Sequence, residues 1–147
     1  MSITQYTQEH IDKMKNAIYE QATWVAELQF NDLPEEVVKA ARRQITDGLG
    51  CMVAGNTTTD LNALPTVDGD CPIFGTDKKA TRQWATLING GAMCKMEYDE
   101  GNWCGYAHTA LHLMPALLVQ GEYLSRTRGL KMKDLIKYHF KDFFKNI

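Results

Sequence analysis

The sequence predicts an all-α fold, a helical bundle-like domain interrupted by one irregular crossing segment. Apolar residues recur every three or four positions over several long stretches, which is the spacing of one helix face. Two of these stretches begin with recognisable helix-start signals. Only CPIFG, residues 71–75, offers a short extended piece. With 147 residues, the chain has the length of one ordinary domain.

The first predicted helix covers residues 5–29, which contain neither Pro nor Gly. Polar residues separate its regularly spaced apolar positions, as expected for a helix with one apolar face. Those positions are Ile11, Met14, Ile18, Ala22, Val25 and Leu28.

The second predicted helix covers residues 34–54 and follows the segment FNDLPEE. Asp32 is a candidate cap, and Pro34 suits a first turn, where its missing N–H would be unpaired in any case. Gly48 and Gly50 each cost about 1 kcal/mol relative to Ala inside a helix. We therefore expect the backbone of another element to pass close to them. Gly55 and Asn56 are expected to end this helix.

The remaining chain alternates between irregular and helical patterns. Residues 57–79 contain two prolines and several Gly, Thr and Asp residues, which predicts the irregular crossing. A third helix is expected from Thr81, its cap, to the acidic residues 97–100, and Gly90 and Gly91 within it again suggest close packing. A fourth helix is expected over residues 109–124. The tail, residues 130–147, has an amphipathic pattern with a Phe-rich face that would need a cover.

Composition excludes several classes of protein. Lys and Arg number 16 against 18 Asp and Glu, so the chain lacks the basic excess of a nucleic-acid-binding protein. No apolar run approaches the roughly 18 residues of a membrane span, and the N-terminus does not resemble a signal peptide. We therefore expect a cytoplasmic protein with no membrane partner. Its four cysteines, Cys51, Cys71, Cys94 and Cys104, are expected to be free thiols.

The richest chemistry lies in residues 95–112, KMEYDEGNWCGYAHTALH. Glu97, Asp99 and Glu100 follow a predicted helix C-terminus, where the helix dipole disfavours negative charge. His108 comes eleven residues after Glu97, and a histidine beside a carboxylate is a common pair for proton transfer. The residues alone leave open an acid/base site, a metal site or a solvated polar loop.

A zinc site would use Cys104, His108 and His112, at intervals of four, with Cys94 or Glu97 as a fourth ligand. The chain has no C-x2-4-C knuckle, and Gly105 weakens a helix through Cys104. We therefore expect no metal.

Two runs resemble signatures of the MmgE/PrpD family. LPEEVVKAARRQITDGLGCMVAG, from Leu33, is similar to an early helix of the family that ends in D-x-L-G-x-x-x-A-G. ATLINGGAMCKMEYDEGNWCGYAHTALHLMPALL, from Ala85, is similar to its A-x-x-N-G-x-x-x-H-x-x-D-x-D-[DE] helix and loop. The first acid of the family motif is an aspartate where this chain has Glu97, and Thr109 stands where a proline usually follows the histidine.

The resemblance implies lyases and isomerases of small polycarboxylates, such as 2-methylcitrate dehydratase, cis-aconitate decarboxylase and iminodisuccinate epimerase. Members need no cofactor and typically form homodimers. Carried onto this chain, it implies that Glu97, Asp99 and His108 are catalytic and that Asn102 orients the substrate. We expect residues 1–147 to form a truncated helical domain without the family's second α/β domain, and to be inactive alone. The alternative is a small helical protein that associates with itself or with a partner.

Overall fold

The structure of the chain is a computed structural model that describes residues 7–60, 68–101, 106–131 and 133–134. These residues form four α-helices, a short 3-10 helix and two two-residue strands. The prediction of an all-α helical domain is therefore confirmed. None of the helices in these ranges is long and apolar enough to cross a membrane. Of the amphipathic, Phe-rich tail predicted for residues 130–147, residues 132 and 135–147 lie outside the described residues.

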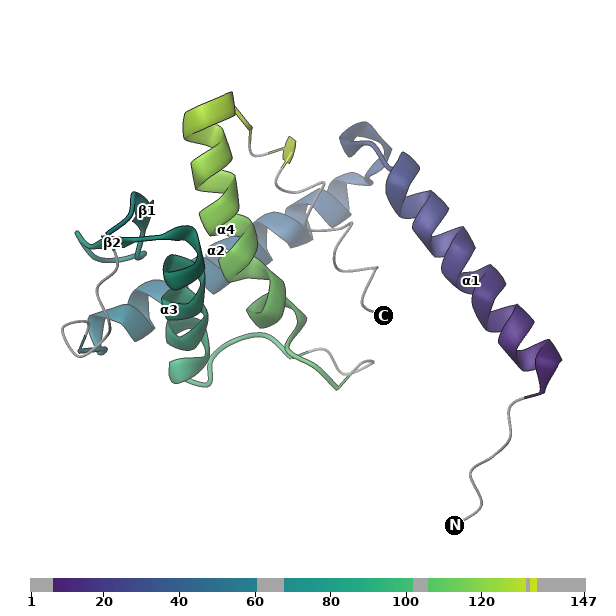
Figure 1. Cartoon of the computed structure of the whole chain (residues 1–147), viewed down its shortest axis with the longest axis horizontal. Coiled ribbons are helices and arrows are strands. Elements are labelled where there is room, and N and C mark those ends of the chain that lie inside the picture. Colours follow the sequence, from purple (N-terminus) through teal and green to yellow (C-terminus); the bar gives the residue numbers. More distant parts are fainter. Residues whose placement is uncertain (1–6, 61–67, 102–105, 132, 135–147) are drawn as a thin grey trace, which may run out of the picture.

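Helix α1 (Gln8–Glu27) projects away from the rest of the chain (Figure 1). Thr7 caps it, because the Thr7 hydroxyl accepts a hydrogen bond from the N–H of His10 at 3.3 Å. Among the described elements, α1 packs against no other helix or strand. Its apolar face therefore lies in solvent, with Met14 55% and Ile18 61% exposed.

The 3-10 helix η1 (Phe30–Asp32) precedes α2 (Glu35–Thr57). The prediction that Asp32 caps α2 is wrong, because the Asp32 carboxylate accepts the N–H of Gln29 at 2.8 Å instead. The N-cap of α2 is Pro34, which makes no side-chain hydrogen bond there.

Helix α2 also continues past the end predicted at Gly55 and Asn56, because both residues are buried against other elements. A Cβ on Gly55 would lie only 1.9 Å from the carbonyl oxygen of Ala92, so the close backbone approach occurs here. Gly48 instead faces the side chains of Met93 and Met114. The prediction for Gly50 is wrong, since a Cβ at this residue would have nothing within 4 Å of it.

The crossing segment contains a small antiparallel pair, β1 (Cys71–Pro72) and β2 (Lys79–Ala80), in which Cys71 lies opposite Ala80. The predicted extended piece at residues 71–75 therefore corresponds to β1 and the turn after it. Helix α3 (Arg82–Lys95) follows, and the predicted cap is confirmed because the Thr81 hydroxyl accepts the N–H of Trp84 at 3.5 Å. Of the glycine pair within α3, Gly90 contacts Pro115, whereas Gly91 has open space beside it.

Helix α4 (Thr109–Arg128) ends at Gly129, which adopts the left-handed conformation with φ of 69°. Helices α3 and α4 pack against each other and across α2 (Figure 1). One core cluster joins these three helices, and a second joins the strands to α3 and α4. The first contains Ala41, Ile45, Cys51, Met52, Met93, Ala110 and Met114, and the second contains Cys71, Ile73, Ala80, Ala85, Ile88 and Val119.

Candidate active site

The acidic loop connects the end of α3 to the start of α4. Within the described ranges, Glu97 and Tyr106 are the two non-glycine residues with positive φ, at 52° and 49°. Such left-handed residues cost about 1–3 kcal/mol each and cluster at functional sites. Asp99 and Glu100 follow closely after Glu97, and His108 comes two residues after Tyr106.

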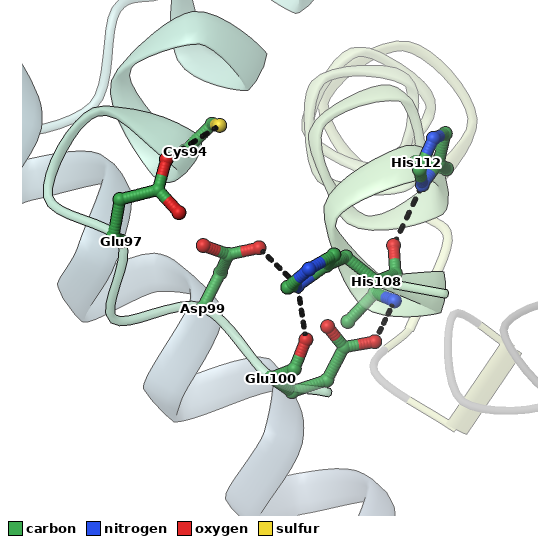
Figure 2. A network of polar contacts seen from close by, with 7 residues as sticks. Cys94, Glu97, Asp99, Glu100, His108 and His112 are labelled. Carbon is green, nitrogen blue, oxygen red and sulfur yellow. Dashed lines mark hydrogen bonds and ion pairs between the residues drawn. The ribbon is translucent and has the colours of Figure 1, made fainter. Parts of the chain in front are cut away.

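The imidazole of His108 is held by acceptors on one ring nitrogen (Figure 2). Its Nδ1 lies 2.7 Å from the carbonyl oxygen of Glu100 and 3.0 Å from Oδ2 of Asp99. A carbonyl oxygen cannot donate a hydrogen bond, and neither can an ionised carboxylate. The contacts of Nδ1 therefore assign a proton to this nitrogen. In the neutral ring, the lone pair is then on Nε2.

Asp99 is the buried member of this pair. Its side chain is 3% exposed, whereas the imidazole of His108 is 52% exposed. The Nδ1–H of His108 is aligned with the Glu100 carbonyl, and Asp99 Oδ2 makes an ion-pair contact without an aligned hydrogen bond.

Glu100 reaches from the loop to the first turn of α4. Its Oε1 accepts a short hydrogen bond from the N–H of Ala110, while its Oε2 is buried without a hydrogen-bond partner. Burial raises the pKa of Glu100 above its ordinary value, and the negative charge of Asp99 acts in the same direction. The Ala110 N–H and the nearby His108 oppose that rise in pKa.

Glu97 lies apart from the contact between Asp99 and His108. Its side chain is exposed, and its Oε1 lies 3.9 Å from the thiol of Cys94. Figure 2 shows Asp99 between Glu97 and His108. Of the predicted site residues, the structure therefore brings Asp99 and His108 into contact and leaves Glu97 to one side. Asn102 lies outside the described residues.

The residues that could hold a metal ion in the structure differ from the set that the sequence suggested. Asp99, Glu100 and His108 offer ligand atoms that lie within 4.8 Å of one another, a donor set suited to a divalent cation. His112 is not part of this group, and its Nδ1 donates to the carbonyl oxygen of His108 at 2.7 Å. Cys104, the remaining member of the zinc set considered above, lies outside the described residues.

An open groove of about 850 Å³ lies beside Glu100. Its other described walls come from α2 and include Arg42, Arg43 and Asp47. Among the described residues, Glu100 thus faces an open groove that solvent can enter, and side chains of both charges line this groove.

A second polar group, which the sequence did not single out, lies in the core. Asn89 is fully buried within α3, where its Oδ1 accepts the N–H of Phe74 at 3.0 Å and its Nδ2 donates to the carbonyl of Pro72 at 3.1 Å. Asn56 Nδ2 also donates to Asn89 Oδ1, at 3.0 Å. The Asn-Gly pair at residues 89 and 90 is the sequence feature that could have indicated this group. The hydrogen bonds of Asn89 hold the crossing segment against α3, and they do not involve the acidic loop.

The sequence that forms these helices and this loop matches a known family of proteins. Residues 20–141 match the MmgE/PrpD N-terminal domain, and the chain therefore belongs to the MmgE/PrpD family. A curated relative, the cis-aconitate decarboxylase-like protein oryM of Aspergillus oryzae, is 28% identical over 117 residues. The aligned part is 76% of this chain and 24% of that relative, so the chain spans about a quarter of the relative's length. No solved structure is significantly similar to the chain.

Proposed function

We propose that this chain contributes a histidine base to a site that removes a proton next to a carboxylate of a small polycarboxylate. The single observation that carries the proposal is the placement of His108 Nδ1 between Asp99 and the Glu100 carbonyl. This placement leaves the lone pair on Nε2, on a ring that is half exposed and can meet a substrate. Family membership and the name of the decarboxylase-like relative support this substrate class.

In the proposed step, His108 Nε2 accepts the proton and the ring becomes an imidazolium. The buried carboxylate of Asp99, 3.0 Å away, stabilises the positive charge that develops. The electron pair of the broken C–H bond stays on the substrate. In dehydration this pair forms the double bond as hydroxide leaves, and in epimerisation it takes a proton back. Loss of carbon dioxide leaves a further electron pair on carbon, so that reaction also requires a proton from the imidazolium or from solvent.

We further propose that this chain does not turn over alone. A polycarboxylate would meet Glu97, Asp99 and Glu100 in the described loop, where His108 is the loop residue that can carry a compensating positive charge. Arg42 and Arg43 of α2 line the groove beside Glu100, whereas the described polar contacts of the His108 ring are to Asp99 and Glu100. Lys95 is directed elsewhere, because its Nζ donates to the Thr58 carbonyl at 2.6 Å. Stabilising the carbanion requires cationic or hydrogen-bonding groups opposite His108. Homodimerisation and cytoplasmic residence remain predictions.

Deuterium exchange tests both parts of this proposal. The purified chain is incubated in D₂O with cis-aconitate or 2-methylcitrate, and NMR follows deuterium incorporation and product formation. We expect slow incorporation by the natural chain and no net product. His108→Asn keeps a donor near the Nδ1 position but removes Nε2, so it should lose the incorporation. Equal incorporation by His108→Asn would refute the base, and rapid product formation would refute the inactivity.

The exposed face of α1 favours a second candidate function, association with another copy or a partner. Met14, Ile18 and Tyr19 are 55%, 61% and 72% exposed. A helix that packs against nothing is marginal in water, because most helical stability comes from burying an apolar face. We expect Ile18→Glu to weaken association in sedimentation experiments, while Gln21→Glu, on exposed polar surface, should not. A monomer at all concentrations for the natural chain would argue against this function.

A further inference from the structure

The start of α4 departs from the usual way in which helices are capped. The first four N–H groups of a helix lack partners within it, and the N-cap side chain normally accepts from one of them. The N-cap residue of α4 is His108, and its side chain makes no capping hydrogen bond. Its ring is turned instead toward Asp99 and the Glu100 carbonyl.

Glu100 fills the place that His108 leaves open. The Glu100 carboxylate accepts the N–H of Ala110, the second residue of α4, from ten positions earlier in the chain. A negative charge at a helix N-terminus is also favoured by the helix dipole. The side chain of Glu100 therefore holds the backbone on which His108 sits.

The backbone of the same residue holds the ring of His108. The Glu100 carbonyl oxygen, 2.7 Å from Nδ1, is the aligned acceptor for the Nδ1–H. Glu100 thus makes two contacts of different kinds, one to the helix start and one to the imidazole. The side-chain contact ties the helix start that carries His108 to the loop residue that supplies the carbonyl.

We propose that Glu100 is the positioning residue of this site. It caps α4 in place of His108 and, through its own carbonyl, holds the imidazole in the tautomer that leaves the lone pair on Nε2. The importance of this role for catalysis rests on the proposed function. The tautomer of His108 does not depend on that function. A free histidine side chain in water favours the opposite tautomer, with the proton on Nε2, so the protein has to impose this one.

Imidazole ¹⁵N chemical shifts measure the tautomer directly. The full chain is labelled with ¹⁵N-histidine, and His108→Gln assigns the His108 signals. At a pH where the ring is neutral, we expect the natural chain to show a protonated Nδ1 and an unprotonated Nε2. No substrate and no turnover are involved, so a failure of the proposed chemistry leaves this result unchanged.

Three variants separate positioning from a merely structural or charge effect. Glu100→Gln keeps an oxygen that can accept the Ala110 N–H, and we expect it to keep the tautomer. Glu100→Asp keeps the charge but is one methylene too short to reach, and it should lower the Nδ1–H population several-fold, as should Glu100→Ala. Glu97→Ala, which removes the exposed neighbouring acid, should have no effect.

The proposal is overturned if the natural chain carries the proton on Nε2, or if Glu100→Asp and Glu100→Ala both keep the natural tautomer. Circular dichroism establishes that each variant is folded, and Glu100→Asp serves if Glu100→Ala does not fold. Zn²⁺ or Mn²⁺ added to the natural chain tests the competing role as a metal ligand. Tight, stoichiometric binding that is lost in Glu100→Gln would also overturn the proposal, because the cation would then displace the Nδ1 proton.

Discussion

Gly55→Ala is expected to destabilise the chain severely, because α2 and α3 touch backbone to backbone at this point. The added Cβ would lie 1.9 Å from the carbonyl oxygen of Ala92, 2.6 Å from its carbonyl carbon and 2.9 Å from its Cα. Real Cβ contacts essentially never fall below 3.0 Å. The helices must therefore separate locally by at least 3.0 − 1.9 = 1.1 Å, and no flexible side chain can absorb this shift.

The size of the effect follows from two opposing contributions. Replacing Gly by Ala within a helix contributes about 1 kcal/mol of stability through backbone propensity. Forcing extra volume into a packed interior costs about 1–3 kcal/mol and occasionally more, and a clash with backbone atoms belongs at the upper end. We therefore expect Gly55→Ala to lower the free energy of unfolding by roughly 2 kcal/mol or more.

Gly50→Ala provides the matched control, because it lies in the same helix with nothing within 4 Å of its added Cβ. It should raise the free energy of unfolding by about 0.5–1 kcal/mol. Urea denaturation followed by circular dichroism measures both variants under identical conditions. If Gly55→Ala proves as stable as the natural chain, the close approach of α2 and α3 is wrong. If both variants lose stability equally, the helical environment of Gly50 is wrong.

Three further predictions concern buried polar groups and thiols. Asn89→Leu should lower the free energy of unfolding by roughly 3 kcal/mol or more, because it removes the acceptor of the buried Asn56 amide and of the partly buried Phe74 N–H; a loss below about 1 kcal/mol in urea denaturation would contradict this. Burial raises the pKa of Glu100 in the folded chain above its ordinary 4.5, so stability should fall as the pH rises from that value through the raised one. The free energy of unfolding measured across this range should show that fall in the natural chain and not in Glu100→Gln. Burial also raises the pKa of the Cys51 and Cys71 thiols, so both should react with iodoacetamide far more slowly in the folded chain than in urea, and equal rates would refute their burial.

Local sequence patterns predict the helices well because capping and periodicity act over three or four residues. Thr81 is recognisable as a cap because its hydroxyl needs only the N–H of Trp84, three positions later. Asp32 shows the limit of the same rule, since its carboxylate accepts a different N–H within the preceding turn. The periodicity over residues 5–29 predicts α1 but carries no information on what would cover its apolar face.

The site is predictable in composition but not in its connections. Asp99 and His108 both stand out in the loop sequence, and the structure brings them to 3.0 Å. Glu100 stands out only as one of three acids, because its partner at Ala110 is ten residues away and the connection depends on the path of the loop.

The buried Asn89 also bears on the order in which the chain folds. Its partners lie 15 residues away at Phe74, 17 at Pro72 and 33 at Asn56. If α2 and α3 docked before the crossing segment returned, Asn56 and Asn89 could bond to each other, but the Asn89 Nδ2 that donates to the Pro72 carbonyl would be buried without that partner, at a cost of about 1–3 kcal/mol. We therefore expect helix docking and closure of the crossing segment to occur in one cooperative step. The folding rate would then be limited by closing this long loop, although most of the described chain is helical.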